Sequence, residues 1–292
     1  MQKFVFLFLL AFVSLFEKVN AQVLDTVVIC NGDSVNIYNL WQTQTGNYSD
    51  PITGNITTLI VNPTPTVTGN FILNGNGAVQ ISPNTYQLTP QLNGQFGSAW
   101  NSVTLDLTQP FNFDVDLYFG VQNTNGADGI AFVLQQVSTS IGVPGGGIGY
   151  QSISPSFGVE FDTWDNGAGM GEPTYDHFAI QQDGNLNHNG VSNLFGPIGF
   201  PPNNINIEDG LWHNVIFNWN PITFNFQVYF DGVLLVNYNN NIITNIFGNN
   251  PSVYWGFTAA TGGANNLQQF RVNSLNVDLS DTTICQYDTI QI

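Results

Sequence analysis

Short apolar runs separated by turn residues cover most of the chain between residues 66 and 280. Gly, Pro and Asn lie between the runs, and no stretch combines sustained helical periodicity with capping residues. The clearest runs of strand length, rich in Phe, Val and Ile, occupy residues 103–107, 111–118, 129–134, 213–219 and 224–230. Many short strands divided by turns predict an all-β sandwich, and about 215 residues are enough for a large core.

Two clusters that overlap these runs, residues 212–219 and 227–232, predict a hairpin in the back sheet of the sandwich. His213 lies in the first segment and is expected to pack within its strand. His188 lies in a stretch rich in Asn, and we expect it to be a solvated loop residue.

Residues 156–163 alternate in the manner of a strand with two different faces. Phe157 and Phe161 belong to one face, whereas Glu160 and Asp162 belong to the other. Residues two apart on a strand lie about 6.5–7 Å apart on the same face. The two carboxylates are therefore expected to point the same way.

A glycine-rich loop follows this strand and returns to a histidine. The loop contains Asn166 and Glu172 and ends at His177, which opens an apolar-rich stretch. Carboxylates, an amide and an imidazole then converge at the end of one hairpin. Burying like charges together is costly unless a cation neutralises them, so the pattern predicts a metal site. Oxygen ligands suit Ca²⁺, and an imidazole suits Mn²⁺ or Zn²⁺, so one cluster can serve two ions. The alternative is an acidic surface hairpin whose histidine merely packs.

The first 21 residues have the pattern of a signal peptide. Lys3 precedes an apolar run over residues 4–16, and Val19-Asn20-Ala21 forms a small-residue cleavage site. The run is short for a membrane span, and no later stretch reaches the ~20 apolar residues that a span needs. We expect a chain that is secreted or displayed at the cell surface, without membrane insertion.

The charge of the chain excludes several partners. It has 3 basic and 20 acidic residues, and loss of residues 1–21 would leave Arg271 as the single basic residue. Nucleic-acid binding needs basic residues that neutralise phosphates, so this class is excluded. Anionic polysaccharides and anionic membranes are poor partners for the same reason, which favours neutral glycans.

Two segments flank the main domain at residues 66–280. Residues 22–65 are expected to be an N-terminal strand segment that ends in a Pro-rich linker. Residues 281–292 repeat the pattern around Cys30 and resemble the opening strand of an immunoglobulin-like module. Cys30 and Cys285 either form a disulfide, which an exported chain permits, or belong to two copies of this pattern.

Four motifs in a fixed order carry a family resemblance. They are Asp128-Gly-Ile-Ala-Phe, Gly145-Gly-Gly-Ile-Gly149, Val159-Glu-Phe-Asp-Thr163 and Trp255-Gly-Phe-Thr-Ala-Ala-Thr-Gly262. Over residues 66–280 the chain resembles the legume-type (L-type) lectins, most of all their exported bacterial members. The resemblance implies a concanavalin-like jelly-roll β-sandwich of two antiparallel sheets. It also implies a Ca²⁺ ion and a transition-metal ion, Mn²⁺ or another, beside a shallow sugar site.

The resemblance assigns ligands to both ions. For the transition ion it implies Glu160, Asp162, Glu172 and His177. For Ca²⁺ it implies Asp162, the backbone carbonyl of Trp164, Asn166 and Glu172. The family usually has Asp at the position of Glu172, and the loop after Asn166 is slightly longer here, so Asp176 is a rival ligand.

The resemblance also implies a sugar site made of Asp128, Gly146, Trp164, Asn166, Gly263 and Ala264. A carboxylate at 128 can accept hydrogen bonds from two vicinal hydroxyls, and charged acceptors make the stronger bonds. Glycine at 146 allows close approach of a backbone N–H, the amide at 166 can donate to a sugar oxygen, and the indole at 164 can stack on a sugar ring. The last two residues lie in the loop that matches the family's specificity loop, which does not name the sugar. In relatives the peptide bond before the aspartate, here Ala127-Asp128, is cis.

Three functions compete for this sequence. A secreted, metal-dependent lectin module in adhesion or glycan capture accounts for all four motifs. A glycoside hydrolase of the same architecture needs Glu-x-Asp-x-Glu, but Trp164 follows Glu160 and Asp162 on that face, so we expect no enzyme. A structural adhesion module would keep the Ca²⁺ and lose the sugar. The family often dimerises edge to edge, and a homodimer would raise avidity for clustered glycans.

Overall fold

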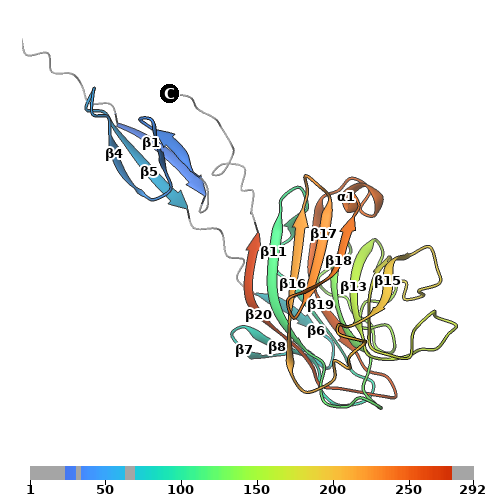
Figure 1. The fold of residues 1–292 in the computed structure, drawn as a ribbon. Coiled ribbons are helices and arrows are strands. Elements are labelled where there is room, and N and C mark those ends of the chain that lie inside the picture. The colour runs from blue at the N-terminus through green and yellow to red at the C-terminus, as the bar shows by residue number, and fades with distance from the viewer. Residues whose placement is uncertain (1–23, 31–33, 63–69, 278–292) are drawn as a thin grey trace, which may run out of the picture. The chain divides into compact units, whose positions relative to one another are not determined.

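The computed structural model describes residues 24–30, 34–62 and 70–277, and the chain divides after Asn62 into two compact units (Figure 1). The predicted signal peptide, Cys285 and the C-terminal segment 281–292 lie outside the described residues. The two interpretations of the cysteines therefore stay predictions.

The first unit contains a small sheet in the order β1-β5-β4 and a separate two-stranded hairpin, β2-β3. Its strands are β1 (Leu24–Cys30), β2 (Val35–Ile37), β3 (Leu40–Gln42), β4 (Gly46–Ser49) and β5 (Ile56–Asn62). β1 runs parallel to β5, and β4 runs antiparallel to it. Fully buried Leu59 and the hydrogen bond of 2.7 Å between the Tyr38 and Thr57 hydroxyls anchor this sheet. The segment thus holds more structure than the strand and linker that the sequence predicted.

The second unit contains an antiparallel sheet of eight strands that carries most of the candidate residues. From one edge to the other its strands are β15 (Asn193–Gly199), β14 (His177–Gln182), β13 (Ser156–Asp162), β12 (Gly129–Gln135), β19 (Ser252–Ala260), β9 (Phe96–Asn101) and β6 (Phe71–Asn74). The two-residue strand β10 (Leu105–Asp106) also pairs with β19.

A second antiparallel sheet of seven strands lies face to face with the first (Figure 1). Its strands, in order, are β18 (Val233–Asn239), β17 (Asn225–Phe230), β16 (Trp212–Asn220), β11 (Phe111–Tyr118), β20 (Gln268–Val277), β8 (Thr85–Thr89) and β7 (Val79–Ser82). The short helix α1 (Ile242–Asn245) follows β18. The predicted hairpin is confirmed, because residues 215–220 of β16 pair with all of β17.

Aromatic side chains from the two sheets form the core between them. Phe132 of β12 stacks on Phe217 of β16 with ring centroids 4.3 Å apart, and Phe113 of β11 stacks on Trp255 of β19 at 4.4 Å. Such pairs add to the free energy already gained from burying these large apolar surfaces. The predicted all-β sandwich of two antiparallel sheets is confirmed.

One predicted strand is much shorter than expected. Of residues 103–107, only Leu105–Asp106 pairs within a sheet. The backbone of Val103 bonds to side chains instead, since its N–H donates to Asn101 and its carbonyl accepts from the Trp255 indole. Hydrogen bonds to side chains thus take the place of the strand-to-strand hydrogen bonds that the apolar composition of this segment predicts.

Truncation of the central aromatic pair is expected to cost much of the stability. Phe132→Ala should lower the free energy of unfolding by about 3–5 kcal/mol, because it removes a fully buried ring that joins the two sheets. Urea unfolding checks this result. The control Val121→Ala removes a side chain that is 62% exposed and should change stability by less than about 0.5 kcal/mol. Equal losses in both variants would contradict the assignment of the core.

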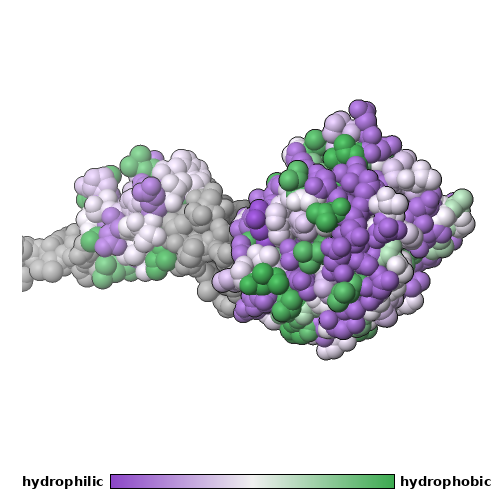
Figure 2. Space-filling model, turned by 90° about the horizontal axis from the view of Figure 1, so that it is seen from below, coloured by the Kyte–Doolittle hydropathy of each residue, from purple (hydrophilic) through white to green (hydrophobic). Residues whose placement is uncertain are grey.

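The face of the second unit seen in Figure 2 is mainly hydrophilic, and hydrophobic residues form small separate groups on it. Within the described ranges, no helix has the length and the apolar character needed to span a bilayer.

Candidate functional site

Strand β13 places two carboxylates inside the protein. Glu160 lies opposite Ala131 of β12 and Ala179 of β14, and Asp162 lies opposite Gly129 and His177. Ala131, Ala179 and Gly129 are small and leave room for the acidic side chains between the strands. Every residue of β13 is buried on both faces. A second apolar cluster, which contains Trp100, Ala131, Val133, Ile148, Tyr150, Ile153 and Leu186, covers the outer face that the sequence suggested to be polar.

The two carboxylates are held in an environment that disfavours their charge. The Tyr150 hydroxyl donates to Glu160 Oε1 at 2.5 Å, while Glu160 Oε2 is buried without a partner among the described residues. Burial, and further the charge of Glu172, raises the pKa of Glu160 to about 8. Burial and the charges of Glu172 and Glu160 also raise the pKa of Asp162 well above its usual range. These groups need protons or a cation to stay buried.

The glycine-rich loop brings Glu172 and Asn166 against this pair. Glu172 is buried and accepts hydrogen bonds from the Asn166 backbone N–H and, at 3.3 Å, from the Asn166 side-chain amide. A Cβ on Gly146 would lie only 3.0 Å from Asn166 Oδ1. A larger residue at 146 would thus crowd the amide that faces solvent.

Asp128 completes a group of four carboxylates at the end of β12. The Ala127-Asp128 peptide bond is cis, as in the relatives described above. The Asp128 side chain is 3% exposed, and its Oδ2 has no partner among the described residues. Burial first, and the charge of Glu172 second, raises the pKa of Asp128 to about 7. Its backbone N–H donates to Ala260 and its carbonyl accepts from Thr163, which fixes the position of this residue.

The loop between β19 and β20 lies beside the segment that leads to Asp128. The Asn265 N–H donates to the Asn125 carbonyl at 2.9 Å. Gly263 of this loop is exposed, whereas Ala264 is buried, with 9% of its surface exposed. Of the predicted sugar-site residues, Gly146 thus lies beside Asn166, and Asp128 lies close enough to the Ca²⁺-site candidate Glu172 for the two charges to repel.

The expectation for His188 is wrong, because this residue is buried beside His177. The two Nε2 atoms lie 3.1 Å apart, and Asp162 Oδ2 lies 3.9 Å from His177 Nε2. Donor atoms of Asp162, His177 and His188 all lie within 4.8 Å of one another. The backbone N–H of His188 donates to the Met170 carbonyl at 2.8 Å, so the Asn-rich loop folds back onto the glycine-rich loop.

The donor set fits divalent cations. Arg271, the single Lys or Arg within the described ranges, forms an ion pair of 2.6 Å with Asp116 on the other sheet. No Lys or Arg of the described residues thus neutralises the four carboxylates of this site. Carboxylate and amide oxygens near Asn166 suit Ca²⁺, and the imidazoles near Asp162 suit a transition ion.

Asp176, the rival ligand, faces a different part of the structure. Its Oδ2 accepts from the Ile207 N–H at 2.8 Å, and burial raises its pKa to about 6. Besides burial, the charge of Asp176 raises the pKa of Glu208. The charge of Glu172, again in addition to burial, raises the pKa of Glu160, Asp162 and Asp128. The structure therefore places Glu172 within the carboxylate group and Asp176 outside it.

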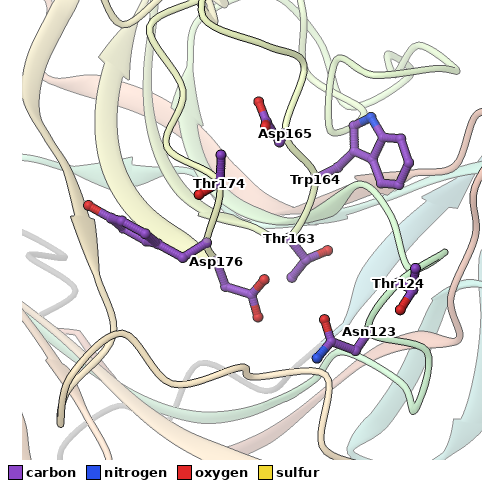
Figure 3. A pocket seen from close by; sticks show the side chains of 8 residues that line it. Asn123, Thr124, Thr163, Trp164, Asp165, Thr174 and Asp176 are labelled. Atoms are coloured by element: carbon purple, nitrogen blue, oxygen red, sulfur yellow. The ribbon is translucent and has the colours of Figure 1, made fainter.

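A cavity of about 180 Å³ opens beside Trp164 (Figure 3). Asp176 points its carboxylate into this space, toward Thr163 and Asn123. The lining consists of Asn123, Thr124, Thr163, Trp164, Asp165, Thr174, Tyr175 and Asp176. Hydroxyls, an amide and carboxylates around one indole are groups that can bind a saccharide. The four ordered motifs did not point to this cavity, because Asn123 and Thr174 lie outside them.

Comparisons with known proteins agree with this architecture. A sequence model of the legume lectin β-barrel domain (the L-type lectin domain) matches residues 63–274. Lectin II from Ulex europaeus is 18% identical, with a TM-score of 0.57 over 72% of this chain and 93% of that chain. A lectin from Bauhinia forficata in complex with GalNAc is 20% identical, with a TM-score of 0.57 over 71% and 91%. The exoplasmic/lumenal domain of VIP36, in a form bound to Ca²⁺ and mannose, is 16% identical, with a TM-score of 0.52 over 71% and 82%. The predicted concanavalin-like sandwich is confirmed.

Proposed function

Since this chain belongs to the L-type lectin family, whose members bind carbohydrates and are not enzymes, we propose that its sugar binding depends on Ca²⁺ held beside Asp128. The observation that carries the proposal is the group of four buried carboxylates with no basic partner among the described residues. A Ca²⁺ ion would neutralise this group and hold the loop from Asp162 to Glu172 in place. The Ca²⁺- and mannose-bound form of the VIP36 domain supports the proposal by analogy.

We assign the roles residue by residue. Asp162, the Trp164 carbonyl, Asn166 and Glu172 would hold Ca²⁺, and Glu160, Asp162, Glu172 and His177 would surround the transition ion. The sugar would contact Asp128, Gly146, Trp164, Asn166, Gly263 and Ala264. When bound, the ions supply charge neutralisation. The contacts to sugar hydroxyls come from the Asp128 carboxylate and the Asn166 amide.

The surroundings of the site favour neutral glycans. Asp165 and Asp176 line the cavity beside Trp164, and carboxylates repel anionic sugars. The cavity is the natural place for a second saccharide unit of a longer glycan, with Trp164 between the two units. We further propose export of the chain, a role in adhesion or glycan capture, and a homodimer that raises avidity.

A glycan array with the purified chain tests the proposal. Binding to neutral glycans in the presence of Ca²⁺, lost after chelation and restored by added Ca²⁺, is the expected result. Absence of binding in both states, together with a chelator-sensitive melting temperature, would instead favour a structural module whose metals only stabilise the fold. Binding that chelation leaves unchanged would contradict the Ca²⁺ dependence.

A further inference from the structure

The site contains two neighbouring imidazoles, His177 and His188, whereas the family pattern contains one histidine. Their Nε2 atoms lie 3.1 Å apart, with the rings at 79°, and both side chains are buried. Two nitrogens at about 2.0–2.1 Å from one Zn²⁺ ion would be separated by about 2.9 Å at a right angle and about 3.4 Å in a tetrahedron. The observed separation of His177 and His188 lies between these values.

The other nitrogen of each ring is held by a neighbour that fixes its orientation. His177 Nδ1 lies 3.3 Å from the Tyr175 carbonyl, and His188 Nδ1 lies 2.5 Å from the side-chain amide of Gln181. Imidazoles that bind metals commonly donate this second N–H to an oxygen of the protein. Gln181 Oε1 is buried without a partner among the described residues, and the two ends of an amide are nearly equal in shape. With the amide turned, this oxygen accepts the Nδ1 proton of His188, and the neighbouring Nε2 atoms of both rings are left available to one ion.

One carboxylate lies beside the two Nε2 atoms. Asp162 Oδ2 is 3.9 Å from His177 Nε2, and donor atoms of Asp162 and both histidines lie within 4.8 Å of one another. Burial lowers the pKa of His177 to about 3 and that of His188 to about 4, so both rings are neutral at pH 7, as metal ligands must be.

We propose that His188 is a second imidazole ligand of the transition ion and that it makes this position select Zn²⁺ over Mn²⁺. Imidazole suits Zn²⁺, whereas carboxylate and water suit Mn²⁺. A second nitrogen ligand in place of an oxygen ligand therefore increases the affinity for Zn²⁺ relative to that for Mn²⁺. The inference rests on the proposed metal dependence of the chain. The rival explanation is a plain N–H···N hydrogen bond between the two rings that has no role in metal binding.

The test compares two histidine variants of the full chain after removal of metals. His188→Gln keeps a polar side chain of similar length but removes the imidazole. His213→Gln is the matched control, because His213 lies in β16 of the other sheet, where it bonds to Asp209 and Asp231, and is the third and last histidine of the sequence. Zn²⁺ affinity is measured by competition with a chromophoric chelator, and Mn²⁺ affinity by electron paramagnetic resonance. Melting temperatures of the metal-free proteins show whether the variants fold.

The expected result is a change in selectivity rather than a general loss. Neighbours that only orient a ligand cost 10–100-fold in affinity, so loss of a ligand should weaken Zn²⁺ binding by at least about 100-fold. Mn²⁺ binding should change by less than about tenfold. His213→Gln should leave both affinities unchanged. Equal weakening of the two ions, or no weakening of Zn²⁺, overturns the proposal.

A measurement on the unmodified protein keeps the proposal testable even when His188→Gln does not fold. X-ray absorption at the zinc edge counts the imidazoles bound to the ion, and two are expected. One imidazole overturns the proposal. Neither experiment contains a sugar, so a failure here leaves Ca²⁺-dependent glycan binding intact, and a glycan array without binding leaves the zinc result intact.

Discussion

Chelation of divalent cations is expected to leave a protein whose melting temperature falls by roughly 5–15 °C when the pH rises from 6.5 to 8.0. The cause is the raised pKa of buried carboxyls, about 8 for Glu160 and about 7 for Asp128. In the unfolded chain these groups ionise near their ordinary pKa, below pH 5. Between that pH and the raised pKa, the folded state alone keeps the proton. Stability is therefore lost as the pH rises, and the loss is complete above the folded pKa.

The window above pH 6.5 separates the carboxyls from the histidines. Burial lowers the pKa of His177 and His188 to about 3 and about 4, below the ordinary value of 6.5. The unfolded chain binds protons at these positions below pH 6.5, whereas the folded chain does not, so the histidines cost stability only in acid. From pH 6.5 to 8.0 the half-protonated imidazoles of the unfolded chain lose their remaining protons, which raises stability by only about 0.4 kcal/mol per histidine, so the carboxyls decide the slope.

Differential scanning calorimetry of the metal-free and the Ca²⁺-loaded chain checks this prediction. Bound Ca²⁺ replaces the protons, so the melting temperature of the loaded protein should fall less between pH 6.5 and 8.0. Part of the remaining fall comes from Glu208, which lies outside the carboxylate group and whose pKa is raised by burial to about 8. Glu208→Gln should abolish that part. Equal slopes with and without Ca²⁺ would show that Ca²⁺ does not neutralise the four carboxylates.

Local sequence patterns predicted those parts of the molecule that depend on neighbours along the chain. Alternation and turn residues located β11 and β16 almost to the residue. The spacing of Glu160 and Asp162 on one strand, followed by a loop that returns to His177, was enough to predict that two carboxylates and an imidazole lie together. Strand periodicity and hairpin closure act over a few residues, so one sequence contains the information.

Contacts between distant segments could not be predicted in this way. His188 lies among Asn and Gly residues, and its burial depends on how the loop after β14 packs on Met170. Tyr150 reaches Glu160 only because a glycine-rich segment folds over β13. Glu208 is buried through a hydrogen bond of 2.8 Å to Asn266, which lies 58 residues away. The segments that contain these residues have the composition of solvated loops. Only tertiary packing distinguishes a buried polar residue there from a solvated one.

Asp128→Asn is expected to weaken sugar binding by roughly 10–150-fold without loss of stability. Asparagine has nearly the same shape, but it replaces one acceptor oxygen with an N–H₂ group and removes the charge. Hydrogen bonds to charged groups contribute about 1.5–3 kcal/mol each, which corresponds to this range of affinity. The same change removes a buried charge that Glu172 repels. The melting temperature of the metal-free protein at pH 8.0 should therefore stay equal or rise.

Asp128→Asn should lower the affinity for glycan but not the melting temperature, so two measurements test this prediction. Isothermal titration calorimetry with the best glycan of the array, in saturating Ca²⁺, gives the affinity, and calorimetric melting gives the stability. The matched control is Asp183→Asn, which also removes one carboxylate, at a turn residue bonded to the Ser154 hydroxyl. Its φ of 62° is one that asparagine adopts readily, so this variant should change neither quantity. A folded Asp128→Asn protein that binds glycan as tightly as the unmodified chain would exclude the Asp128 carboxylate from sugar recognition. A loss of affinity together with a lower melting temperature would assign Asp128 to the fold rather than to the sugar.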